Sequence, residues 1–195
     1  MYCLVFYEGD DCLFDFKHPK NKQFFDFWQT IPREGMVPRR QDYHPEKVAA
    51  LLPTMMMYEL VSSDYIKVRL LGTGITEDFG KEREGQNFLD FIEPHRQDKV
   101  SQALWEIARY PCGMRVLAEH VLKSGLTVML ESVGLPLLNR DDKVRWILFQ
   151  RNILDVEKGL PIIKSDRVYD PKTYVRLFQR DYIDIGTGVS NFHEE

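Results

Sequence analysis

The sequence predicts an α+β domain in which flanking helices pack on a five-stranded antiparallel sheet. Two strand-like segments, 55–61 and 65–71, precede the clearest helix of the chain, and three more strands follow it. Gly, Asn and Asp residues separate the last three strands and supply the backbone freedom that hairpins require. The long helix must therefore cross the sheet, and its single apolar face suits that position.

Composition places the chain among ordinary globular proteins. It has 195 residues, of which 44% are apolar and 29% charged, enough for one core with extensions. The net charge of −4 gives no reason to expect nucleic acid as a partner. No apolar run is long enough to span a bilayer, and the apolar start 1–7 lacks the basic leader of a signal peptide. We therefore expect a cytoplasmic protein.

Three segments divide the chain. Residues 1–20 are expected to form an N-terminal extension, 21–156 the domain, and 157–195 an appendage that is partly flexible. Within the appendage, Asp170-Pro171 predicts the start of a short helix that runs through Leu177.

The first helix, over residues 21–31, has an aromatic face made by Phe24, Phe25 and Trp28. An apolar face shows that something covers it, but not what. One interpretation is that it packs on its own domain. The other is that it is a dimer contact, because a symmetric dimer covers the same patch on both subunits. We expect a homodimer that uses this face.

The strand 65–71 alternates in character, which is typical of a half-buried antiparallel strand. Ile66, Val68 and Leu70 are predicted on one side, with Lys67 and Arg69 on the other. After it, Thr73–Phe79 predicts a short helix, and Pro94 opens the long helix that Pro111 ends.

Short motifs in a fixed order carry a family resemblance. The order and spacing together resemble the PAS-like family PAS_5, which occurs mostly as small stand-alone proteins in alphaproteobacteria. The resemblance covers roughly residues 24–152. The matching residues are Trp28, Pro38, Arg40, Asp42, Leu52-Pro53, Arg69, Gly72-Thr73, Gly80, Glu82, Gly85 and Leu135-Pro136-Leu137.

The resemblance implies a PAS-like sheet and a sensory or regulatory module of a bacterial signalling system. Such a module binds a small molecule, a signalling protein or both, and is not an enzyme. Two alternatives stay open: a protein-docking adaptor whose pocket its own side chains fill, and a small enzyme that uses the sheet cavity. Paired ionisable groups in a pocket would mark the enzyme.

The helical segment of such a fold covers the sheet, so the concave face is the expected cavity. The candidate ligand-binding residues are Met57, Arg69, Thr73, Phe91, Met129 and Trp146. Arg69 has a second interpretation, in which it pairs with the carboxylate of Asp42 or Glu59.

A basic turn at Arg39, Arg40 and Asp42 precedes a predicted helix start. These residues either bind an anion, with the helix N-terminus helping, or form an Arg–Asp pair that fixes the incoming chain. We favour the pair, because a guanidinium matches a carboxylate and needs no ligand.

The chemistry of cofactors and metals has little support in the sequence. The five histidines are scattered, and Cys3, Cys12 and Cys112 form no CxxC pair. We expect the cysteines to be apolar fillers in a reducing compartment, and no metal site, catalytic group or bound chromophore. No motif in the sequence identifies a cofactor, so the cofactor is left open.

Overall fold

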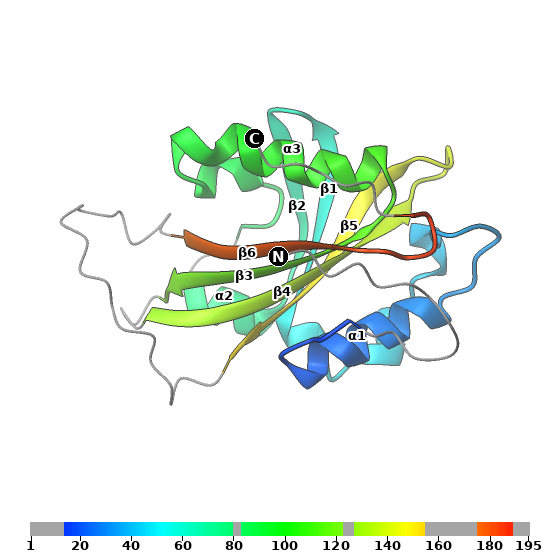
Figure 1. The fold of residues 1–195 in the computed structure, drawn as a ribbon, viewed down its shortest axis with the longest axis horizontal. Coiled ribbons are helices and arrows are strands. Elements are labelled where there is room, and N and C mark those ends of the chain that lie inside the picture. Colours follow the sequence, from blue (N-terminus) through cyan, green and yellow to red (C-terminus); the bar gives the residue numbers. More distant parts are fainter. Residues whose placement is uncertain (1–13, 80–82, 123–126, 155–174, 189–195) are drawn as a thin grey trace.

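A computed structural model describes residues 14–79, 83–122, 127–154 and 175–188. One antiparallel sheet lies between two helical layers, with the helix nearest the N-terminus on one face and the longest helix on the other (Figure 1). The predicted α+β class is confirmed. The predicted number of strands was too low, because the sheet has six strands and the last comes from the C-terminal appendage.

Within the described ranges, three α-helices and six strands form this arrangement. The helices are α1 (Pro19–Thr30), α2 (Thr73–Phe79) and α3 (Pro94–Arg109). The strands are β1 (Met55–Ser62), β2 (Tyr65–Leu71), β3 (Gly113–Val121), β4 (Thr127–Leu138), β5 (Val144–Ile153) and β6 (Val175–Ile183). Four 3₁₀ turns complete the set: η1 (Arg40–Asp42), η2 (Pro45–Val48), η3 (Leu52–Thr54) and η4 (Phe88–Phe91).

The strands lie in the order β2-β1-β5-β4-β3-β6. After β2 at one edge, the chain runs through α2, η4 and α3 and re-enters the sheet at β3. β6 then pairs with β3 from Gly113↔Ile183 to His120↔Val175. The helix predicted through Leu177 is therefore wrong at its end, because Leu177 lies within β6; its start at Asp170-Pro171 lies outside the described residues.

Both faces of the sheet are covered, and this explains the unbroken apolar run in β1. Met55 and Met57 belong to the core under α1, whereas Met56 and Tyr58 belong to the core under α3. Successive side chains of a strand point to opposite faces, so a strand that is covered on both faces loses its polar alternation.

A β-bulge changes the expected face of one residue in β2. The register shifts from Met57↔Leu70 to Tyr58↔Val68, which leaves Arg69 as the extra residue. Ile66 and Val68 lie under α3, as predicted together, but Leu70 packs with the core under α1. The prediction that Leu70 shares their side is therefore wrong.

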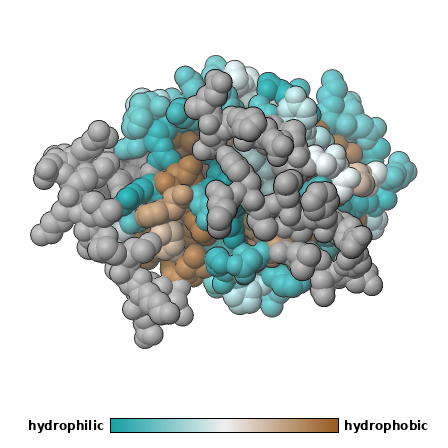
Figure 2. Space-filling model, in the orientation of Figure 1, coloured by the Kyte–Doolittle hydropathy of each residue, from teal (hydrophilic) through white to brown (hydrophobic). Residues whose placement is uncertain are grey.

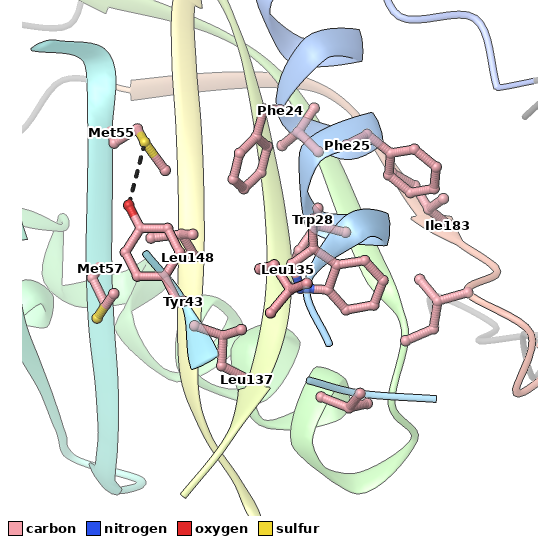
Figure 3. Close-up of a cluster of buried hydrophobic side chains, with 14 of the residues drawn as sticks. Phe24, Phe25, Trp28, Tyr43, Met55, Met57, Leu135, Leu137, Leu148 and Ile183 are labelled. Carbon is pink, nitrogen blue, oxygen red and sulfur yellow. Dashed lines mark hydrogen bonds between the residues drawn. The ribbon is translucent and has the colours of Figure 1, made fainter. Parts of the chain in front are cut away.

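The aromatic face of α1 lies in the chain's own core (Figure 3). Phe24 and Phe25 are 0% exposed and Trp28 is 1% exposed. The Trp28 Nε1–H donates a hydrogen bond of 3.0 Å to the carbonyl of Pro136. A buried side chain cannot contact a second subunit, so the prediction of a dimer contact at Phe24, Phe25 and Trp28 is corrected to domain packing.

A buried carboxylate anchors the start of α1 to the sheet. Glu131 on β4 is 0% exposed and accepts hydrogen bonds from the backbone N–H of Lys17 at 2.9 Å and of His18 at 2.7 Å. The side-chain amide of Asn21 donates a third at 2.9 Å. Arg115 lies 3.8 Å from Glu131 and is itself paired with Asp181 on β6 at 2.6 Å. Charge on this face is thus paired within the fold.

Hydrogen bonds to the β1–β2 hairpin hold α3 over the other face. The Trp105 Nε1–H donates to the carbonyl of Ser62 at 3.2 Å, and the Ser101 hydroxyl donates to that of Ser63. The outward side of α3, at the top of Figure 2, is mostly hydrophilic. In the described part of the chain, no helix is both long and apolar enough to cross a membrane.

Candidate ligand-binding cavity

A cavity of about 170 Å³ lies between the sheet and the helical layer of α2, η4 and α3. Most of its lining is apolar, as in typical small-molecule sites. The apolar lining residues are Met56, Tyr58, Val68, Leu71, Ile75, Phe88, Phe91, Ile92, Val100, Ala103, Leu104, Met114, Val116, Ala118, Val121, Phe149 and Leu177. The other lining residues are Arg83, Arg96, His120, Ser132, Arg151 and Arg180.

A glycine leaves room for Phe149, one of the rings that line the cavity. Gly134 on β4 pairs with Phe149 on β5, and a Cβ at Gly134 would overlap the Phe149 ring. Tyr58 stacks on Phe88 with ring centroids 4.5 Å apart and lies 5.4 Å from Phe149. Burial raises the pKa of the Tyr58 hydroxyl, so it stays protonated at neutral pH.

Four arginines from four separate segments line the cavity; we call Arg83, Arg96, Arg151 and Arg180 the arginine cluster. Arg83 precedes η4 and lies 4.0 Å over the Phe91 ring. Arg96 is on α3, Arg151 on β5 and Arg180 on β6.

Carboxylates on the helical side contact two members of the cluster. Asp78 on α2 accepts a hydrogen bond of 3.3 Å from Arg151, which holds α2 to β5. Glu93 lies 3.9 Å from Arg96, one turn before it. Burial lowers the pKa of Arg83 and of Arg151, since each charge loses water, but an arginine stays charged at physiological pH.

The pKa of His120 on β3 is lowered by burial and by the positive charges that line the cavity. Burial, together with the smaller repulsion of the protonated ring by Arg151, Arg83 and Arg96, lowers its pKa to about 3. The imidazole is therefore uncharged at neutral pH and adds a polar group without adding charge.

Of the six predicted ligand-binding residues, one lines the cavity and five lie elsewhere. Phe91 lines the cavity, whereas Thr73, at the start of α2, and Met129, on β4, do not. Met57 packs under α1, on the opposite face of the sheet. Met57 was placed on the wrong face because the apolar run of β1 gave no sign of which residues face α3.

Arg69 and Trp146 also lie away from the cavity. Arg69 pairs with Glu59 at 2.6 Å, which is one of the two carboxylates expected for it. The guanidiniums of Arg69 and Arg40 lie 5.5 and 5.9 Å from the centre of the Trp146 ring. Trp146 packs beside the core under α1 and lines a second, more open hollow together with Arg39 and Arg40.

The basic turn has a partner other than the predicted one. The Arg39 side chain pairs with Asp142 in the β4–β5 turn. The Arg39 backbone forms an isolated β-bridge with Leu138. Asp42 was the expected partner and belongs to η1. An Arg–Asp pair does fix the incoming chain to the sheet, but across a longer sequence distance than we expected.

Two members of the arginine cluster could have been found from the sequence. Arg151 follows Ile147 and Phe149 at a spacing of two, so the period of a strand places it on the same face. Arg96 precedes Val100 by four residues and Ala103 by seven, which places it on the apolar side of α3. Arg83 and Arg180 gave no such signal, because the fold brings their segments to the cavity.

Other reactive groups lie outside this cavity. Cys112 is buried in the core, and burial raises the pKa of its thiol to about 12. Cys3 and Cys12 lie outside the described residues. In the ranges that the structure describes, His, Cys, Asp and Glu form no group that could hold a metal ion.

Comparison with known proteins gives the family. Residues 16–148 match the model of PAS_5, described as a PAS domain. No curated protein matches the chain.

Solved structures with similar folds include the Drosophila melanogaster Cycle PAS-B domain, with 10% identity, a TM-score of 0.40, and coverage of 51% of this chain and 97% of that one. VqmA bound to DPO has 16% identity, a TM-score of 0.42, and coverage of 57% and 58%. An RNA-binding Light-Oxygen-Voltage receptor has 15% identity, a TM-score of 0.43, and coverage of 64% and 35%.

Proposed function

This chain belongs to the PAS_5 family of PAS domains, and we propose that it is a non-enzymatic sensory module of a bacterial signalling system that binds a small ligand under α3. The observation that carries the proposal is the cavity itself. It combines an apolar lining with a few polar groups, which is the usual composition of a ligand site.

The cavity lies where a ligand would contact the helical layer and the sheet together. Its lining includes residues of α3 and η4 on one side and of the sheet on the other. A ligand that binds one packing of these layers better than another shifts the population toward that packing. Arg180 extends the lining to β6, so the C-terminal strand would respond as well.

Action without catalysis is part of the proposal. The hydroxyl of Tyr58 stays protonated and the imidazole of His120 stays uncharged at neutral pH. Among the described lining residues there is no carboxylate to pair with them as an acid or a base.

Partners beyond a small molecule remain predictions. Self-association would need a surface other than the aromatic face of α1, and sedimentation velocity at micromolar concentration measures it directly. The expectation of no nucleic-acid partner rests on the net charge of −4. Binding of labelled RNA or DNA at physiological salt would contradict that expectation.

Native mass spectrometry of the freshly purified protein tests the proposed function. We expect an added mass that is lost on denaturation, and loss of it in Ala103→Phe, which fills the cavity from α3. Gln102→Phe is the matched control, since Gln102 is exposed on the same helix. If each of the three proteins has the same mass before and after denaturation, no ligand is bound, and this result would instead favour the docking adaptor.

A further inference from the structure

We propose that the cavity takes a small molecule with an apolar body and an anionic group, such as a carboxylate, and that the anion binds at the arginine cluster. This inference rests on the proposed ligand-binding function and names the chemical class of the ligand.

The fold gathers the cluster from segments far apart in the sequence. Arg83, Arg96, Arg151 and Arg180 come from a loop, a helix and two strands, and all four line the cavity. His120 lies close enough to three of them that their charges disfavour its protonation. Their electrostatic effects thus converge within the cavity.

The lining carries positive charge. Among the described lining residues, four are arginines and none is an aspartate or glutamate. Asp78 and Glu93 contact Arg151 and Arg96, and members of the cluster have further partners within the chain. Each guanidinium has five N–H donors in a fixed fork, so it can keep such a partner and still donate to a ligand.

An anion is the charge type that this environment favours. A carboxylate that enters an apolar cavity loses water, and charge-assisted hydrogen bonds from arginine offset that loss. A cation would lose its water and also be repelled. A neutral molecule would gain from apolar burial alone.

The apolar space fits one ring or a short alkyl chain. The volume is about 170 Å³. An engineered apolar cavity of about 150 Å³ in another protein holds benzene. A phenyl ring on a short acid is therefore a suitable probe, with the ring among residues such as Phe149 and Leu104.

Calorimetric titration of the full chain with three matched probes tests this inference. The probes are 3-phenylpropanoate, 3-phenylpropan-1-ol and 3-phenylpropylammonium, which share the ring and differ in charge. At pH 7.5 we expect the acid to bind about tenfold or more tighter than the alcohol, from hydrogen bonds to charged donors. The ammonium compound should bind more weakly than the alcohol.

A pair of variants on α3 locates the anion. Arg96 and Arg109 each contact a glutamate three residues earlier, but of the two only Arg96 lines the cavity. Arg96→Met should weaken binding of the acid about tenfold and leave binding of the alcohol within about twofold. Arg109→Met should change neither, and thermal unfolding confirms that both variants fold.

Each other outcome has a distinct meaning. Equal affinity for acid and alcohol, or no effect of Arg96→Met on the acid, would overturn the anion inference and leave the cavity as a ligand site. No binding of any probe at millimolar concentration would overturn both this inference and the proposed function.

Discussion

Alternate residues of the same strands build the two faces of the sheet, yet the faces differ in packing and in charge. Under α1 the face is filled by aromatic and aliphatic side chains, and the charge of Glu131 is neutralised by Arg115. Under α3 the helical layer leaves a cavity that the arginine cluster lines. One face is thus closely packed, whereas the other leaves the space in which we propose that a ligand binds.

Removal of Trp28 should have the largest effect on stability. Trp28→Ala deletes a side chain that is 1% exposed and leaves the Pro136 carbonyl without its donor. We expect a loss of about 3–5 kcal/mol in the free energy of unfolding, measured with urea. Gln23→Ala, on the exposed side of α1, should cost less than about 0.5 kcal/mol. A cost below about 1 kcal/mol for Trp28→Ala would mean that this face is not closed.

Removal of the buried carboxylate of Glu131 should have the second-largest effect on stability. Glu131→Ala removes the carboxylate that accepts from the backbone N–H groups of Lys17 and His18 and from the Asn21 amide, and it takes one carboxylate from Arg115. We expect a loss of about 2–4 kcal/mol in the free energy of unfolding. Glu34→Ala on the exposed surface is the control. If the two variants are equally stable, the network does not anchor α1.

The same truncation on the two faces should give different costs. Val133 on β4 is 0% exposed under α1, whereas Val116 on β3 lines the cavity. Val133→Ala should cost about 2–3 kcal/mol, from the lost methyl groups and the new void. Val116→Ala should cost under about 1 kcal/mol, because part of its surface has no neighbour to lose. Equal costs in chemical denaturation would contradict the contrast between the faces.

The cavity should also make stability depend on pH. The pKa of His120 is about 3 in the folded state against 6.5 ordinarily, so below pH 6.5 the unfolded state binds a proton that the folded state does not. The contribution of His120 to the free energy of unfolding is therefore fully present above pH 6.5 and is lost as the pH drops toward 3. From pH 6.5 to 5 this amounts to at most about 2 kcal/mol.

His120→Asn should remove that part of the pH dependence, whereas His95→Asn should keep it because His95 is exposed. Urea unfolding at several pH values measures both. A wild-type profile that matches His120→Asn would show that the cavity does not hold an uncharged histidine.

The sequence was sufficient for five of the six strands and for α1, α2 and α3, but not for the faces of the strands. The apolar character of 55–61, the alternation of 65–71 and the turn residues between them placed both strands within a residue of their observed ends. The run Met55–Met57 carries no alternation, because both faces are buried, so Met57 was placed on the wrong side. The sixth strand was missed because Asp170-Pro171 favoured a helix.

The arginine cluster was missed for a different physical reason. Charged residues are usually solvated, so Arg83 and Arg151 were not considered as lining residues. The strand period alone places Arg151 on the α3 side, but its contact with Asp78, far away in the sequence, comes only with the fold, as does the position of Arg83 over the Phe91 ring. Phe91 was predicted because it belongs to the helical segment that such a fold places over the sheet.

The most direct test of a ligand site under α3 is methyl NMR during titration with 3-phenylpropanoate. The phenyl ring should shift the methyl signals of cavity residues such as Ile92, Leu104 and Val116, and leave those of Val133 and Leu148 under α1 nearly unchanged. Saturable shifts confined to the first group are the predicted result. Shifts confined to the second group, or no shifts at millimolar acid, would contradict the account.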